Sequence, residues 1–180
     1  MSKQLFALST SIGLLAGIWS ALALALPMLG PVPFVLWPTF AAWATFFYAG
    51  ASVDGMLKGL VQLFTGAILS FILMSGFVAL GSPGPAPLVI GFIVLLIAWT
   101  LTAISGVSKW WSQVPAGFCG AALFFGVAST PALVESKQVW SSLHLLATLL
   151  PILAGQGLGW LSNYLASFAQ PEKARVHAAT

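Results

Sequence analysis

The sequence predicts an all-α integral membrane protein with six transmembrane helices, because charged residues are scarce and long uncharged stretches recur. Of its 180 residues, 59% are hydrophobic and only 5% are charged, and the mean hydropathy is +1.02. A water-soluble domain carries about 25% charged residues, so these few charges could not cover a soluble surface of this size. A helix needs roughly 20 apolar residues to cross the hydrocarbon core. Lipid is therefore the expected solvent for most of the surface.

Turn residues divide the first half of the chain into three apolar segments. The first, residues 5–29, is longer than the ~7–15-residue core of a signal peptide, so we expect a retained helix. Cleavage after "ALALAL" is the alternative. The Pro- and Gly-rich turn "PMLGPVP" introduces a second helix at residues 32–51, and "SVDG" introduces a third at residues 56–80.

The second half divides in the same way. The turn "GSPGPAP" precedes a helix at residues 88–105, "KWWSQVP" precedes one at 114–132, and the last is expected at 139–166. Only helices or closed barrels pair all backbone groups in lipid, and these runs are too long for barrel strands of about 9–11 residues. The prediction is one transmembrane domain over residues 1–168 and a polar cytoplasmic tail over 169–180.

Basic residues predict the orientation of these helices. With six crossings and a cytoplasmic N-terminus, the outer loops hold only Lys137. The other basic residues fall in cytoplasmic loops or in the tail: Lys3, Lys58, Lys109, Lys173 and Arg175. Because short cytoplasmic loops are enriched in Lys and Arg, this bias places both termini in the cytoplasm.

Residues 78 positions apart match in the two halves. Phe40 falls on Phe118, and Phe46 and Phe47 fall on Phe124 and Phe125. Small residues and one isoleucine pair at the same offset: Ala42 with Gly120, Gly50 with Ala128, Ile12 with Ile90. A three-helix unit repeated in one chain must invert its orientation in the membrane, as in many transporters and channels. The 3+3 inverted repeat is thus a hypothesis, with chance identity in an apolar chain as its alternative.

Small residues in the second and fifth segments predict close helix packing. Small side chains four positions apart let two backbones approach, as Ala116 with Gly120 and Ala122 with Gly126 would allow. The expected packing residues are Ala42, Gly50, Ala116, Gly117, Gly120, Ala122 and Gly126. Six short helices enclose little space, so we also expect a homo-oligomer.

Four stretches carry a family resemblance: "SIGLLAGIWSALA", "FAAWATFFYAG", "GMLKGL" and "VPAGFCGAALFFGVAS". Together they resemble the YcdZ-like proteins, a family of small bacterial inner-membrane proteins of unknown function. The resemblance covers most of residues 10–130. It implies a multi-pass protein of the bacterial inner membrane, and it assigns no activity and no catalytic residue.

The sequence offers little for catalysis. Its acids, Asp54, Glu135 and Glu172, all fall outside the predicted helices, so no catalytic triad can form within the membrane. Asp54 is expected to cap a helix and to pair with Lys58 four residues later. The histidines and the lone Cys119 make no metal-binding cluster, and no basic run suggests nucleic acid. We expect no enzyme, cofactor, metal or nucleic-acid partner.

His144 is the most distinctive side chain of the last segment. It lies one helical turn inside Trp140, which we expect at the outer interface, and Thr148 lies one turn further. Ionisable residues within membrane helices are rare and often mark a pathway. One interpretation is an interfacial or capping histidine, and the other is a pore-mouth or gating residue.

Aromatic and mildly polar side chains within the segments suggest a path for a small solute. The polar ones include Thr39, Thr45, Gln62 and Gln156, which could bond across helices or line a pore. The path candidates are Trp19, Thr39, Phe40, Trp43, Phe46, Phe47, Trp99, Phe118, Phe124, Phe125, His144 and Thr148. The leading hypothesis is a passive channel or facilitator for a small neutral or weakly polar solute. An accessory membrane subunit and an ion-coupled transporter are the alternatives.

Overall fold

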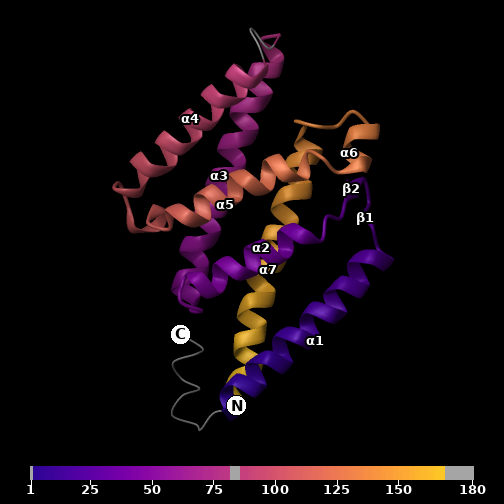
Figure 1. Ribbon diagram of the computed structural model, residues 1–180, viewed down its shortest axis with the longest axis vertical. Coiled ribbons are helices and arrows are strands. Elements are labelled where there is room, and N and C mark those ends of the chain that lie inside the picture. The colour runs from indigo at the N-terminus through magenta and orange to yellow at the C-terminus, as the bar shows by residue number, and fades with distance from the viewer. Residues whose placement is uncertain (1, 82–85, 169–180) are drawn as a thin grey trace.

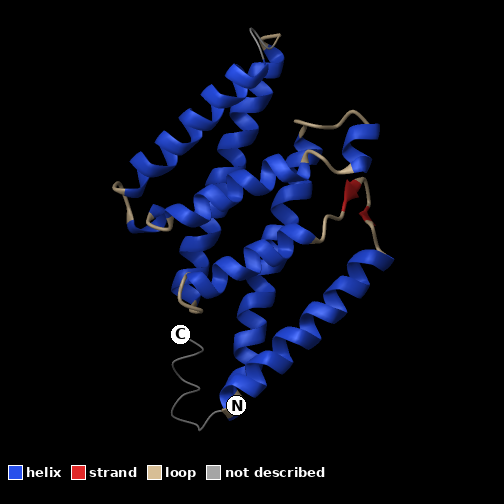
Figure 2. Cartoon of the chain, in the orientation of Figure 1, coloured by secondary structure: helices blue, strands red, loops and turns tan. Residues whose placement is uncertain are grey.

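The chain folds into helices joined by short turns, which confirms the all-α class. The computed structural model describes residues 2–81 and 86–168. Its elements follow in chain order: α1 (Lys3–Ala25), β1 (Met28–Leu29), β2 (Val32–Pro33), α2 (Trp37–Tyr48), α3 (Val53–Ala79), α4 (Ala86–Ser105), the 3-10 turn η1 (Lys109–Trp111), α5 (Val114–Val127), α6 (Pro131–Glu135) and α7 (Ser142–Ser167). The two strands pair into one antiparallel hairpin (Figure 2).

Four of these helices are long and apolar enough to cross a membrane. They are α1, α3, α7 and the part of α4 from Pro87 to Ser105. Their length and composition are compatible with a membrane protein, as the sequence predicts. The helices α2 and α5 are shorter, with 12 and 14 residues. At 1.5 Å per residue they span about 18 and 21 Å, less than the ~30 Å hydrocarbon core.

The expected ranges of the two short helices were therefore too long. The hairpin occupies residues 28–33, and α2 begins only at Trp37. Gly50 and Ala51, with φ of 94° and 52°, end it in a left-handed turn that a helix cannot continue. Beyond Val127, a turn leads into α6, a short helix that the sequence did not predict. The apolar residues before α2 and after α5 therefore belong to turns, to the hairpin and to α6, and they do not extend the two short helices.

The other boundaries shift by a few residues. Helix α1 ends at Ala25, before Pro27, instead of at residue 29. Helix α3 begins at Val53, because the Ser52 hydroxyl accepts a hydrogen bond from the Gly55 amide. Helix α7 begins at Ser142, with Ser141 as its cap, so residues 139–141 are not helical. The predicted tail, residues 169–180, lies outside the described residues.

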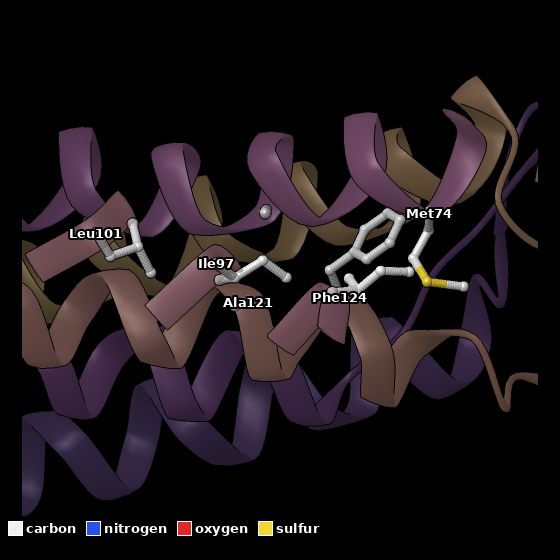
Figure 3. Close-up of a cluster of buried hydrophobic side chains, with 7 residues drawn as sticks. Met74, Ile97, Leu101, Ala121 and Phe124 are labelled. Carbon is white, nitrogen blue, oxygen red and sulfur yellow. The ribbon is translucent and has the colours of Figure 1, made fainter. Parts of the chain in front are cut away.

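The two short helices cross the two long central ones. Helix α5 packs on α3, α2 packs on α7, and α3 and α7 also contact each other. Helix α1 packs on α7 and α4 packs on α3, so these two lie on the outside of the bundle (Figure 1). A core cluster between α3, α4 and α5 includes Met74, Ile97, Leu101, Ala121 and Phe124 (Figure 3).

Candidate functional site

Glycine lets the backbones of α2 and α7 come into contact. At Gly155 of α7, an added Cβ would overlap the Thr39 carbonyl oxygen and lie 2.9 Å from the Trp43 nitrogen. At Gly159, one turn further, it would lie 2.7 Å from the side chain of Phe46. These positions therefore need a residue without a side chain, and they fix where α2 crosses α7.

The crossing of α5 and α3 is built in the same way. At Gly66 of α3, an added Cβ would overlap the Gly117 carbonyl oxygen and lie 2.8 Å from the Ala121 nitrogen. On the facing side, a Cβ at Gly120 would overlap the Leu63 carbonyl oxygen. Gly117 and Ala121 follow Thr39 and Trp43 by the same 78 positions, so equivalent backbone atoms of α2 and α5 meet a glycine in both crossings.

Gln156 places an amide group inside the α2–α7 crossing. It is 1% exposed, and its Nε2 donates hydrogen bonds of 2.6 Å to the Ala42 carbonyl and the Thr45 hydroxyl. Its Oε1 is buried without a hydrogen-bond partner, beside Gly59 of α3. The hydroxyl oxygen of Thr39, in the same crossing, is also buried without a partner.

Gln62 does the same at the α5–α3 crossing. Its side chain is fully buried, and its Nε2 donates to the carbonyl of Trp111, the last residue of η1 before α5. Trp111 donates through its ring nitrogen to the Thr65 hydroxyl over 3.2 Å. The Gln62 Oε1 faces Gly117 and has no partner. A buried acceptor without a donor costs about 1–3 kcal/mol, so each of these oxygens calls for an explanation.

His144 is fully buried and fully hydrogen-bonded. Its Nδ1 accepts from the Trp140 amide over 3.1 Å, so its Nε2 carries the proton and donates to the Phe124 carbonyl over 2.8 Å. Its ring stacks on that of Phe124, with centroids 4.2 Å apart. Thr148 donates to the His144 carbonyl one turn back. The neutral imidazole thus joins the start of α7 to α5.

Trp140 lies in the turn before α7 and not on the helix. Its φ is 69°, and its ring packs against Phe124, Phe125 and His144. Counting helical turns from Trp140 therefore does not give the depth of His144. Gating by His144 stays a prediction, and it would require an incoming proton to displace the Trp140 amide from Nδ1.

Two apolar grooves lie where the outer helices meet the short ones. The groove between α1 and α2 measures about 250 Å³ and is lined by Ile12, Ala16, Phe40, Trp43, Ala44 and Phe47. The groove between α4 and α5 measures about 240 Å³ and is lined by Val94, Ile97, Phe118, Ala121, Ala122 and Phe125. Five pairs of lining residues are 78 positions apart: Ala16 and Val94, Phe40 and Phe118, Trp43 and Ala121, Ala44 and Ala122, Phe47 and Phe125.

Residues 9–167, which include both crossings and both grooves, match the family described as a protein of unknown function, DUF1097. The chain belongs to the DUF1097 family. No curated protein and no solved structure matches it. The family description names no activity and no source, so the YcdZ-like resemblance and the bacterial inner membrane remain predictions.

The path candidates of this DUF1097 chain fall into three environments. Thr39, Trp43, Phe46, Phe124, His144 and Thr148 are buried in the bundle. Phe40, Phe47, Phe118 and Phe125 line the two grooves. Trp99 points outward with 69% exposure, and Trp19 packs edge-on against Phe34. The structure thus places Thr39, Trp43 and Phe46 at the α2–α7 crossing and brings neither Trp19 nor Trp99 there.

The predicted packing residues also differ in how closely they are packed. Ala42, Ala116, Gly117 and Gly120 are buried, and Gly126 lies against the ring of Trp37. Gly50 lies in a turn with open space around it, and Ala122 is exposed in a groove. Gly66, Gly155 and Gly159 are not among the seven expected packing residues, yet they are contact points of the crossings. Residue spacing holds no signal for Gly66, because its contact with α5 depends on which helices cross.

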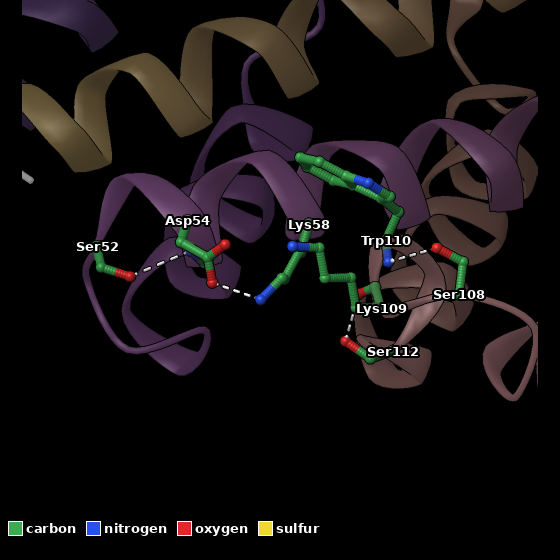
Figure 4. Close-up of polar contacts among 8 residues, drawn as sticks. Ser52, Asp54, Lys58, Ser108, Lys109, Trp110 and Ser112 are labelled. Carbon is green, nitrogen blue, oxygen red and sulfur yellow. Dashed lines mark hydrogen bonds and ion pairs between the residues drawn. The ribbon is translucent and has the colours of Figure 1, made fainter.

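Charged groups lie at the ends of the helices. Asp54, in the first turn of α3, pairs with Lys58, as the sequence predicts. Lys109 lies nearby with its ammonium 5.8 Å from the Trp110 ring centre (Figure 4). Within residues 2–81 and 86–168, no three His, Cys, Asp or Glu side chains lie close enough together to hold a metal ion.

Proposed function

We propose that the chain is a six-crossing membrane protein of two inverted three-helix repeats, and that it is a passive channel or facilitator for a small neutral solute. The observation that carries the proposal is the set of buried, unpartnered oxygens at the two crossings. These belong to Gln62, Gln156 and Thr39. Such oxygens accept hydrogen bonds, so the solute would be a donor such as ammonia, water or a small amide.

The contacts of the two short helices support the inverted repeat. Each short helix crosses the long third helix of the other half, α2 on α7 and α5 on α3. Equivalent backbone positions meet glycine in both crossings, and five pairs of groove residues keep the same offset of 78. Chance identity between apolar segments could match residue types, but it would not be expected to give the two short helices equivalent contacts with glycine. In transporters with inverted repeats, the site lies near the midplane between the halves, where these crossings would sit.

The distribution of charge supports passive transport of a neutral solute. Ion-coupled transport usually needs an acidic or basic side chain inside the membrane. Among the described residues, Asp54 and Glu135 are both exposed and lie at helix ends, and Asp54 is paired. Amide and hydroxyl oxygens can replace one or two hydrogen bonds of a neutral solute, whereas an ion would lose a complete hydration shell.

Flux through liposomes tests the channel. Purified protein is reconstituted, and light scattering follows swelling under gradients of ammonia, urea and glycerol. Q156L and Q62L remove the acceptors and are expected to lower flux of the transported solute by about tenfold, the effect of ~1.4 kcal/mol on a barrier. Q138L, in an exposed loop, is the matched control and should leave flux unchanged.

The outcome of this assay separates the three hypotheses. No flux of any solute above empty liposomes would contradict the channel and favour an accessory subunit. Uptake that rises when a proton or sodium gradient is imposed would favour ion coupling. Equal flux in Q156L, Q62L and the control would contradict a path through the two crossings.

Cysteine labelling tests the six-crossing topology. In a C119S background, S112C lies beside Lys109 and Q138C lies beside Lys137, in turns that the proposal places on opposite sides of the membrane. With a membrane-impermeant maleimide on intact cells, Q138C should be labelled and S112C protected until the cells are opened. Labelling of both in intact cells would contradict the proposed orientation.

A further inference from the structure

The groove of about 700 Å³ between α1 and the end of α7 has one charged end and an apolar bed. Lys3 lies at its mouth, and Phe6, Leu14 and Leu165 are among the residues that line it. The hydroxyls of Thr10 and Ser11 also border it, but both donate to backbone carbonyls and so are already used. Among the described residues, no acidic side chain lines it.

We propose that this groove binds one anionic phospholipid, with its phosphate at Lys3 and an acyl chain along α1. Lys3 has no ion pair among the described residues, and it lies in the first turn of α1. The first amides of a helix carry a positive partial charge that favours an anion, which adds to the attraction of the ammonium. The apolar bed below would solvate the lipid chain.

The length of the groove fits one leaflet of a bilayer. From Lys3 to Leu14, helix α1 rises by about 16 Å at 1.5 Å per residue. Half of the hydrocarbon core is about 15 Å thick. A lipid with its headgroup at Lys3 would therefore end its chain near Leu14, where the lining of the groove ends. A hydrogen bond joins α1 to α7 along this groove: the Ser11 hydroxyl donates to the Ser162 carbonyl over 2.8 Å.

The site does not depend on the channel activity. It uses the side of α1 that borders the end of α7, away from the α5–α3 crossing, and Leu165 is the residue of α7 that lines it. A protein without any solute flux could still bind the lipid. Conversely, loss of the lipid site would leave the proposed path through Gln62 and Gln156 intact.

Native mass spectrometry of the full chain, delipidated in detergent, tests the proposal. The protein is titrated with phosphatidylglycerol and with phosphatidylcholine of identical acyl chains. The first phosphatidylglycerol is expected to bind about fivefold more tightly, the effect of one lysine near an anionic surface. K3A should reduce this preference to about one, whereas K137A, on an exposed turn, should keep it.

A second variant tests the apolar bed. Ala7 is half-buried and lines the groove, so A7W places a large ring in it and should weaken binding of both lipids without lowering the melting temperature. Equal preference in K3A and wild type, or unchanged binding in A7W, would overturn the proposal. It would also be overturned if removal of residues 169–180 strengthened lipid binding, or if A7W dissociated a lipid-free oligomer, because the occupant would then be the tail or a second copy.

Discussion

Adding one methyl group at Gly66 or Gly155 is expected to destabilise the protein by about 1–3 kcal/mol, the usual effect of overpacking. In G66A the new Cβ would overlap the carbonyl oxygen of Gly117, and in G155A that of Thr39. Both neighbours are backbone atoms of a packed helix, so they cannot rotate away. Each short helix would have to move off its long partner. Thermal unfolding of detergent-purified protein measures the effect.

The same two helices supply matched controls. Gly76 of α3 and Gly157 of α7 have no atoms within 4 Å of an added Cβ. G76A and G157A are therefore expected to leave stability unchanged or to raise it slightly, since alanine is the better helix former. Equal melting temperatures for G66A, G155A and the two controls would show that the crossings are not as close as the structure has them.

Replacing His144 with leucine is expected to lower stability by about 1–3 kcal/mol, the usual range for buried polar groups left unpaired. Leucine would fill much of the space but would leave the Trp140 amide without the imidazole that accepts from it and would remove the donor to the Phe124 carbonyl. The stacking on Phe124 would also be lost. The expected result is a lower melting temperature, together with increased hydrogen exchange at the turn before α7.

Thr148 provides the control for this substitution. It is equally buried on the same helix, but its hydroxyl bonds only to the His144 carbonyl of its own helix. T148V should therefore change the melting temperature little. If H144L were no more destabilising than T148V, the two bonds of the imidazole would contribute nothing to holding α5 and α7 together.

Composition and turn residues were enough to predict the helical class and the approximate order of the helices. Pro27, Gly30 and Pro31 mark the first turn, and the hairpin lies there. The lengths of α2 and α5 could not be predicted, because hydropathy treats an apolar turn and an apolar helix alike. Val35 and Leu133 are as apolar as helical residues, yet Val35 precedes α2 and Leu133 belongs to the separate helix α6.

The candidate site was only partly visible in the sequence. The offset of 78 pairs residues of α2 with residues of α5 from residue identity alone. It could not say that these helices cross α7 and α3, since a contact partner is not encoded in spacing. Gln62 and Gln156 looked like ordinary polar residues, and only the fold shows that their Oε1 atoms lack donors. His144 looked ionisable, and its partners show why the neutral ring is favoured.

The brevity of α2 and α5 has a consequence for the surrounding bilayer. In the proposed six-crossing topology, helices of about 18 and 21 Å cannot match a hydrocarbon slab of about 30 Å, and hydrophobic mismatch of this kind is relieved by local thinning of the lipid. Water would then reach deeper beside these helices than elsewhere. Along the proposed solute path, the water-free distance across the membrane would be shorter by several ångströms, and the dehydration barrier would narrow accordingly. Thinner membranes would accommodate this protein with less deformation than thick, sterol-rich ones.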